Sequence, residues 1–437
     1  MAEHADYSYL KTRAQKLLPI VRRQARRAYV VELTGTPKAG KTTSLGILHA
    51  FFKACGYRVQ LQKERAGDCP LPMKGHFFFN AWTTSTMLAE VVAAVETNVD
   101  LILLDRAFFD ALIWLELQLR RGQVSEDESR TFASFVLLER WRSLVDITTV
   151  MTAVPTVALE RENKNAIVPR TGSIMNSAAL QEFNDVLRTV RERHANDFTF
   201  LEVDSSSTTV DVVELNADLA GRLLDSLEDW ADPPVAVIER KQVEELFGDE
   251  VLIRGDKLAP AWAKLSAGAR PMKRSTAEES VDVVQLVGCG VCLSENSAFV
   301  LERSAADEKA ESYGPYTLWK GCHIEMRSGE PPPIDVAARS VVGRLESDLH
   351  LKQIAKPEPI ALAWDRNARS ESRHLGFLFL LKISDKQIIK SLEVKEFRKS
   401  SRGHTLVGRL ANREELLSSI DKFEPWSRAL VEGNIVP

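Results

Sequence analysis

Cysteine is scarce in this chain, with five in 437 residues. So few thiols do not predict a disulfide framework, and we expect a reducing, cytoplasmic location. Long apolar runs are also lacking, since none approaches the roughly 20 residues that a membrane-crossing helix needs. The first residues, Met1 to Asp6, lack the apolar segment of a secretory signal. We therefore expect no association with a membrane.

Neither sign of charge dominates, because 57 Lys and Arg face 61 Asp and Glu, for a net charge of −4. This balance argues against a polyanion-binding chain and against nucleic acid as the partner. Residues 1–28 are an exception, with basic side chains from Lys11 to Arg27 and apolar ones such as Leu10 and Leu17 at helical spacing. We expect a basic helix packed on the domain that follows; contact with nucleic acid or another partner is the alternative.

A phosphate-binding pattern follows this segment. Gly35, Gly40, Lys41 and Thr42 fit G-x-x-x-x-G-K-[ST]. The apolar run 29–33 before it predicts a buried strand, and 41–55 after it predicts a helix. Glycines let the backbone N–H groups point at phosphate oxygens, next to the positive end of the helix. A chance glycine-rich turn is the alternative, and the flanking elements argue against it.

The pattern assigns chemical roles within the loop. Lys41 is expected to reach the β- and γ-phosphates, and the Thr42 hydroxyl to hold Mg²⁺. The residues expected to bind ATP are Gly35, Thr36, Pro37, Lys38, Ala39, Gly40, Lys41, Thr42 and Thr43. ATP and Mg²⁺ are therefore the expected cofactors.

Strands and helices alternate over residues 29–230, which predicts a three-layer α/β domain with a parallel sheet. The expected strands are 29–33, 58–62, 99–104, 147–151 and 198–203. Residues 229–235 contain two prolines and predict a hinge. A separate α+β domain is predicted over 231–437. Its expected strands are 283–293, 299–303, 316–319, 360–365, 375–383 and 406–408, and its expected helices are 335–348 and 413–421.

Residues 29–229 resemble the thymidylate kinase branch of the P-loop nucleoside and nucleotide kinases. Besides the phosphate loop, the resemblance lies in residues 63–71 after the second strand, in Leu104-Asp105-Arg106, and in residues 154–161 with Lys164 and Arg170. It implies that Lys41 and Arg161, with Lys164 or Arg170, surround the transferred phosphoryl group. It also implies that Arg106 grips an acceptor phosphate and that Asp105 orients Mg²⁺.

The acceptor stays open between a nucleoside and a nucleoside monophosphate. A nucleoside hydroxyl needs a carboxylate to take its proton, and Glu64 is the first candidate, with Asp68 in reserve. The charge order Glu64-Arg65 and the residues that follow depart from the family pattern, which bears on the acceptor more than on the ATP site. Phe77 to Phe79 and Trp82 are expected mainly as packing residues, with a base pocket as the alternative.

The second half resembles the Nudix superfamily, in its predicted-phosphoesterase branch. The matching stretches are 318–326, Gly329-Glu330, 337–351, 373–379 and 423–427. The stretch that should carry paired metal-binding glutamates reads Gly343-Arg344-Leu345-Glu346-Ser347-Asp348. Scattered carboxylates hold Mg²⁺ poorly. We therefore predict a Nudix-like domain that binds a nucleotide or a partner without hydrolysis, with a residual hydrolase as the alternative.

The combined prediction is an ATP- and Mg²⁺-dependent nucleoside or nucleotide kinase joined to a degenerate Nudix-like domain. A regulatory P-loop NTPase without small-molecule kinase activity, and a scaffold that only binds ligands, are the rival hypotheses. A homodimer is left open. Cys289 and Cys292 have C-x-x-C spacing, with Cys322-His323 later in the chain. On a strand, positions three apart face opposite sides, so we do not expect a metal or redox site there.

Overall fold

The protein is represented by a computed structural model that describes residues 7–24, 27–71, 76–95, 98–165, 175–207, 209, 211–302, 315–327, 334–349, 356–366, 373–383 and 407–436. The chain divides into two compact units, Met1–Ala231 and Asp232–Pro437. Each unit has its own sheet and its own apolar cores. No helix within the described ranges is both long and apolar enough to cross a membrane.

The first unit is built on a five-stranded sheet in the order β2-β3-β1-β4-β5, and all of its pairings are parallel. Its strands are β1 (Tyr29–Gly35), β2 (Val59–Gln62), β3 (Leu101–Asp105), β4 (Ile147–Thr152) and β5 (Phe200–Asp204). Central strand β1 places Leu33 beside Asp105 and Gly35 beside Met151, so the carboxyl ends of three strands meet at one edge. The predicted parallel sheet is confirmed.

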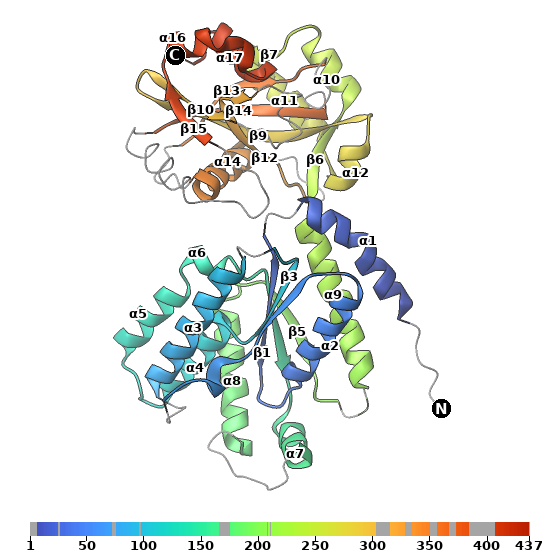
Figure 1. The fold of residues 1–437 in the computed structure, drawn as a ribbon, viewed down its shortest axis with the longest axis vertical. Helices are drawn as coiled ribbons and strands as arrows, with labels where there is room; N and C mark the ends of the chain where they lie inside the picture. The colour runs from blue at the N-terminus through green and yellow to red at the C-terminus, as the bar shows by residue number, and fades with distance from the viewer. Residues whose placement is uncertain are drawn as a thin grey trace. The chain divides into compact units, whose positions relative to one another are not determined.

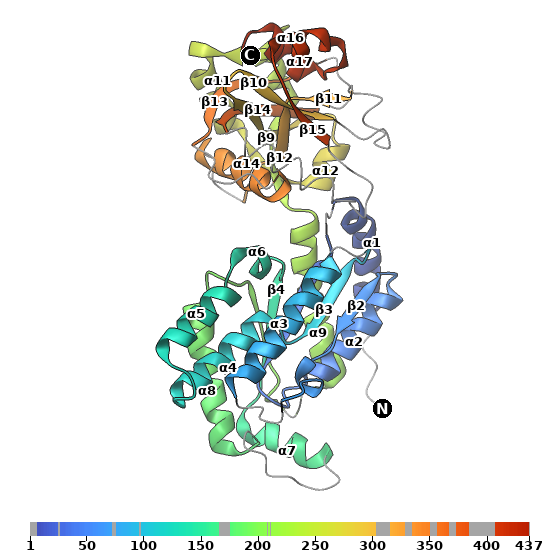
Figure 2. The same cartoon turned by 60° about the vertical axis from the view of Figure 1, so that its left-hand side comes forward.

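Helices cover both faces of this sheet (Figures 1 and 2). They are α1 (Ser8–Gln24), α2 (Lys41–Ala54), α3 (Phe77–Val95), α4 (Phe108–Arg120), α5 (Glu126–Val136), α6 (Glu139–Arg142), α7 (Pro155–Asn165), α8 (Ser177–Arg193) and α9 (Val212–Ala231). Alternation along β1 explains the two cores, because Val31 and Leu33 pack with α1, α2 and α9, whereas Val30 packs with α3, α4 and α8. Glu32 therefore lies on the same face as Val30.

The basic N-terminal helix α1 packs against α9 through Leu10, Ala14, Leu17 and Val21. Its arginines contact acidic side chains of the same unit. Arg13 pairs with Asp225 and Glu228, and Arg22 pairs with Asp100. These ion pairs support packing on the domain over the nucleic-acid alternative.

The second unit contains a ten-stranded mixed sheet. Its strands are β6 (Pro234–Glu239), β7 (Leu252–Arg254), β8 (Arg270–Lys273), β9 (Val283–Ser294), β10 (Ser297–Glu302), β11 (Tyr316–Thr317), β12 (Trp319–His323), β13 (Glu358–Ala363), β14 (His374–Lys382) and β15 (Val407–Ala411). Its helices are α10 (Arg240–Phe247), α11 (Leu258–Gly268), α12 (Arg274–Glu279), α14 (Ile334–Leu349), α16 (Arg413–Ser418) and α17 (Pro425–Glu432). The predicted α+β architecture of this half is confirmed.

Two glycines of β9 let α14 approach the sheet closely. A Cβ at Gly288 would lie 2.7 Å from the Val341 side chain, and one at Gly290 would lie 2.7 Å from Leu345. The opposite face of the sheet is covered by α17, whose Trp426 contacts Gly376. Cys289 and Cys292 belong to the cores on these opposite faces, so the two thiols do not converge on one site.

Three details of the second half were predicted wrongly. The expected strand 316–319 is two strands, because Leu318 donates its N–H to Ser427 Oγ while Thr317 pairs with β10 and Trp319 with β9. The expected helix 413–421 ends at Ser418, and a 3₁₀ turn follows. The elements β6 to α12 were missed, since the predicted strands began only at residue 283.

Candidate functional site

The phosphate loop joins β1 to α2 and is shaped by two glycines with positive φ. Gly35 has φ 124°, and a Cβ there would lie 1.9 Å from the carbonyl oxygen of Met151. The same carbonyl accepts a hydrogen bond of 3.0 Å from the Thr36 N–H. Gly40 has φ 99° and occupies the N-cap position of α2. Only glycine fits at position 35, as the sequence pattern predicted.

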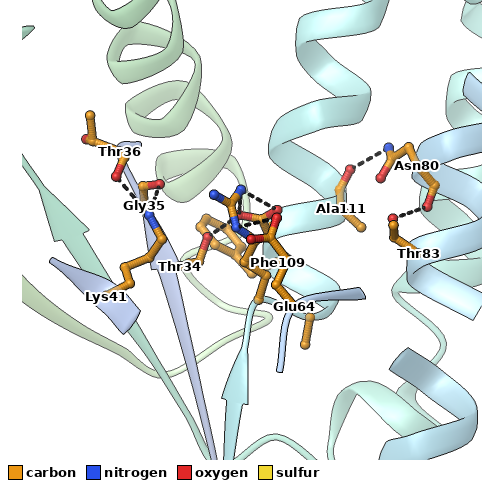
Figure 3. A network of polar contacts seen from close by, with 12 residues as sticks. Thr34, Gly35, Thr36, Lys41, Glu64, Asn80, Thr83, Phe109 and Ala111 are labelled. Carbon is orange, nitrogen blue, oxygen red and sulfur yellow. Dashed lines mark hydrogen bonds and ion pairs between the residues drawn. The ribbon is translucent and has the colours of Figure 1, made fainter. Parts of the chain in front are cut away.

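Lys41 is buried under this loop (Figure 3). Its Nζ donates to the carbonyl oxygens of Gly35 at 2.9 Å and Thr36 at 2.8 Å. Burial lowers the pKa of the ammonium group to about 7, and the positive charge of Arg106 acts in the same direction. A triphosphate seated in the loop would supply the negative charge that keeps this ammonium protonated.

Thr42 and Asp105 converge from the start of α2 and the end of β3. The Thr42 hydroxyl donates to Asp105 Oδ2 at 3.3 Å. Burial raises the pKa of the Asp105 carboxyl, and the Arg106 charge opposes this. A hydroxyl beside a carboxylate is the oxygen donor set that Mg²⁺ prefers, so these two residues fit the predicted metal role.

Arg106 follows β3 in an unusual backbone conformation, with φ 65°. Its N–H donates to Leu33 O of β1 at 3.0 Å. Its guanidinium lies 3.2 Å from Glu64 Oε1 through Nε and 3.3 Å from Asp110 Oδ2 through Nη1. Burial lowers the pKa of Arg106, but the charges of Asp110, Glu64 and Asp105 outweigh burial and raise it.

A cavity of about 270 Å³ opens beside this arginine. Glu64, Asp105, Arg106 and Asp110 line its charged end. The remaining lining residues include Phe79, Asn80, Thr83, Met87, Trp114 and Gln118. Figure 3 shows Asn80 on the side away from Lys41, where its Nδ2 donates to Ala111 O at 3.0 Å.

Sequence reasoning missed several of these residues. Asp110 and Trp114 lie one turn apart on α4, which reads as an apolar helix, and Asn80 interrupts an apolar stretch of α3. A charged Asp110 four residues after Arg106 was the available signal. Of the aromatic candidates, Phe79 lines the cavity, whereas Phe77 packs against Phe132 with ring centroids 5.2 Å apart.

The structure thus brings Lys41, Glu64, Asp105 and Arg106 together. Arg161 has a different set of contacts. It donates to Ser205 O at 2.7 Å and to the phosphate-loop carbonyl of Lys38 at 3.3 Å. Lys164 forms an exposed ion pair with Glu160, and Arg170 is outside the described residues. The structure therefore places Arg161 against the loop tip and the segment after β5.

In the second unit, the expected metal helix corresponds to α14. Glu330 and the side chains of Glu346 and Asp348 are outside the described part of the chain. The matching stretch 423–427 has a packing role. Glu424 is fully buried and accepts from Trp319 Nε1 at 2.9 Å and from the Trp426 and Ser427 N–H groups at 2.8 Å each. These bonds cap α17 and fix β12.

Comparison with known proteins gives structural neighbours only. A scan against protein-family models found no match, and a search of curated proteins found none. Among solved structures, deoxyadenosine kinase from M. mycoides, with dCMP and a flexible dCDP bound, is 19% identical. It covers 45% of this chain and 99% of its own, with a TM-score of 0.36. The same kinase with dATP bound is 18% identical, covering 45% and 98%, with a TM-score of 0.35. Tm1382, proposed to be a Nudix hydrolase, is 18% identical, covering 46% and 97%, with a TM-score of 0.33.

Proposed function

We propose that the first unit transfers the γ-phosphoryl group of ATP to a nucleoside. One observation carries the choice of acceptor. The guanidinium of Arg106 lies between the carboxylates of Glu64 and Asp110, with Asp105 next to it. Arg65, which also lines the cavity, is likewise paired with carboxylates, so both arginines are already matched. A phosphate dianion would have to displace these carboxylates and would be repelled by them, whereas a neutral hydroxyl would not.

The proposed chemistry assigns a role to each side chain. The phosphate loop and Lys41 hold the triphosphate, and Thr42 with Asp105 would hold Mg²⁺, which neutralises charge on the phosphates. A nucleoside hydroxyl attacks the γ-phosphorus, the bond to the bridging oxygen breaks, and ADP leaves. Glu64 accepts the hydroxyl proton. Arg106 holds Glu64 in place, and its guanidinium would stabilise charge on the transferred group.

The experiment is an ATP-consumption assay across nucleosides and nucleoside monophosphates. We expect turnover with at least one nucleoside and weaker turnover with its monophosphate. Glu64→Gln should lower kcat by 10²–10⁴-fold, the usual size of a general-base contribution, with little change in ATP affinity. Arg188→Ala removes an exposed ion pair with Asp185 and serves as the control. Faster transfer to a monophosphate would contradict the choice of acceptor.

The regulatory NTPase is the second candidate, and Arg106 separates it from a kinase. Arg106→Ala should lower kcat/KM for transfer to a nucleoside by about 10²–10³-fold, whereas ATP hydrolysis by a switch protein would need only the phosphate loop and the metal. ATP hydrolysis that no nucleoside stimulates, unchanged by Arg106→Ala, would favour the regulatory role. A chain that binds ATP but turns over none of it would favour a binding scaffold.

For the second unit, we propose binding of a nucleotide or a partner without hydrolysis. The support is the sequence of α14, in which Ser347 and Asp348 replace paired glutamates. The test uses the full chain with Lys41→Ala, which silences the phosphate loop. Incubation with a panel of nucleoside diphosphate derivatives and Mg²⁺ should release no phosphate or nucleoside monophosphate. Release would favour the residual hydrolase.

A further inference from the structure

Glu32 is a fully buried carboxylate in the middle of central strand β1. The proposed phosphoryl transfer gives it no role. It lies on the face of the sheet that α4 covers, between Val30 and Thr34 on the same side. A buried carboxylate is costly unless hydrogen bonds satisfy its oxygens, so its partners should reveal why it is there.

All three hydrogen bonds of Glu32 come from the first turn of α4. Oε1 accepts from the N–H of Ala107 at 2.8 Å and of Asp110 at 3.1 Å, and Oε2 accepts from Phe109 N–H at 3.2 Å. A helix leaves these N–H groups without partners in its own backbone. The N-cap position of α4 is Ala107, which has no side-chain acceptor. Glu32 therefore caps α4 from the neighbouring strand.

The same turn carries Arg106, the arginine at the charged end of the cavity. Arg106 precedes the capped residues and has φ 65°, a left-handed conformation that is unfavourable for a residue with a side chain. β1 holds both peptide groups that flank Arg106. Leu33 O accepts from the N–H of Arg106, and Glu32 accepts from the N–H of Ala107. The capped turn also presents Asp110, which contacts the Arg106 guanidinium and accepts from Thr34 Oγ1 at 2.7 Å.

We propose that Glu32 is a positioning residue for Arg106, the arginine at the edge of the cavity. By capping α4, it keeps Arg106 in the left-handed conformation and directs its guanidinium towards Glu64 at the edge of the cavity. The expected effect on catalysis rests on the proposed transfer to a nucleoside. The expected effect on the conformation of Arg106 does not depend on that proposal.

The charged groups around Glu32 decide the pH of the test. Asp110 is the carboxylate on α4 that faces it, and Arg106 lies beyond Asp110. Burial raises the pKa of Glu32 to about 7, while the hydrogen bonds from the backbone of Asp110, Phe109 and Ala107 act against burial. At pH 8.5 the carboxylate is ionised and can accept all three bonds, so we choose that pH.

The first experiment is a double-mutant cycle with Glu32→Gln and Arg106→Ala. An amide cannot accept with its nitrogen, so Glu32→Gln should lower kcat/KM for the nucleoside by about 10–100-fold, with ATP affinity changed less than twofold. If Glu32 acts through Arg106, the same change in the Arg106→Ala background should have less than a twofold effect. If the losses in kcat/KM of the two single variants multiply in the double variant, the two residues act independently and the proposal is overturned.

A matched control separates positioning from stability. Asp146 has a side chain that is only 8% exposed, and its carboxylate accepts from the N–H of Val30 of β1 at 2.8 Å and pairs with Arg27. Asp146→Asn should lower Tm without changing kcat/KM. If Glu32→Gln does not fold, Glu32→Asp keeps the charge on a shorter side chain and should show a smaller loss of the same kind.

A crystal structure of the Glu32 variant gives a readout that needs no turnover. We expect the φ of Arg106 to change and its contact with Glu64 to be lost. A guanidinium that stays in place would overturn the positioning role. If the wild-type chain transfers no phosphoryl group but Arg106 moves in the variant, the proposed reaction fails and the positioning role stands.

Discussion

The phosphate loop and the acceptor cavity meet at Asp105 but are built by different means. The loop offers backbone N–H groups and one buried lysine from consecutive residues, shaped by Gly35 and Gly40. The cavity takes its charged residues from separate elements, with Glu64 after β2, Arg106 after β3 and Asp110 on α4. The loop's N–H groups and lysine would suit a highly charged anion, whereas both arginines of the cavity are already paired with carboxylates. Under the proposed function, the loop takes the triphosphate and the cavity takes an uncharged acceptor.

The largest expected effect is on the loop, where Gly35→Ala places a Cβ 1.9 Å from Met151 O. The positive φ alone costs roughly 1–2 kcal/mol, and the overlap forces β1 and β4 apart. We expect ATP affinity to fall more than a hundredfold and Tm to fall by several degrees, measured by calorimetry and thermal unfolding. Gly46→Ala, at an exposed position of α2 where nothing lies within 4 Å of the added Cβ, is the matched control. Normal ATP binding by the Gly35 variant would show that the loop adopts another shape.

The next largest effect is the pH dependence of ATP affinity, which should come from Lys41. Its pKa is lowered to about 7 by burial and by Arg106, while Asp110, Asp105 and Glu64 raise it. ATP binds the protonated form, so above pH 7 binding must take up a proton, and Kd should rise about tenfold per pH unit. Below pH 7 the lysine is already charged and this dependence disappears.

Calorimetry in buffers of different ionisation enthalpy measures that proton directly. At pH 8 we expect uptake of about 0.9 proton per ATP, the fraction of a group with a pKa near 7 that is deprotonated there. Lys41→Arg, whose guanidinium stays charged, should remove the uptake. A binding enthalpy that is the same in every buffer at pH 8 would contradict a lowered lysine pKa.

The same contrast decides what the sequence could predict. The loop is local, so four residues at fixed spacing after a strand predicted its position and the helix that follows it. Asp105 and Arg106 were predicted from the family resemblance, and their position directly after an apolar strand supported that prediction. Asp110 was missed although Arg106 lies four residues before it. Glu32 and Asn80 were missed because their partners are distant along the chain, as in the bond between Asn80 and Ala111. A single sequence contains no signal for such pairs.

The two halves of the fold differ in the same way. Parallel strands separated by helices give long apolar runs, and the first unit followed that pattern closely. In the second unit, β11 and β12 are split by a bond from Leu318 to Ser427, which is far away in the chain. The strands and helices between residues 234 and 280 are short, from 3 to 11 residues, and were missed. Tertiary contacts, more than local propensity, define these elements.

A moderate effect is expected at Asp110, where removing one carboxylate should weaken the exclusion of charged acceptors. Asp110→Asn keeps the shape and leaves Glu64 as the remaining partner of Arg106. We expect the ratio of kcat/KM for a nucleoside to that for its monophosphate to fall about tenfold, or about 1.4 kcal/mol, a plausible size for one charge in a partly desolvated site. ATP affinity should change little. An unchanged ratio would mean that shape, and not charge, excludes the monophosphate.

The smallest effect on the site is expected from Asp100, a buried carboxylate just before β3, at the opposite end of that strand from Asp105. Burial raises its pKa, but bonds from Arg58 and Arg22 outweigh burial and lower the pKa to about 2. A lowered pKa contributes stability above pH 4, which is lost as the pH falls towards 2, and the difference corresponds to about 2 kcal/mol. Asp100→Asn should therefore lower the free energy of unfolding by about that amount at pH 7 and by little near pH 2, with kinetics unchanged. If the difference in the free energy of unfolding between the two proteins were the same at pH 7 and pH 2, the ionised Asp100 would not stabilise the fold through its arginines. A change in kinetics would mean that the two ends of β3 are coupled, so that the acceptor cavity depends on more than the residues lining it.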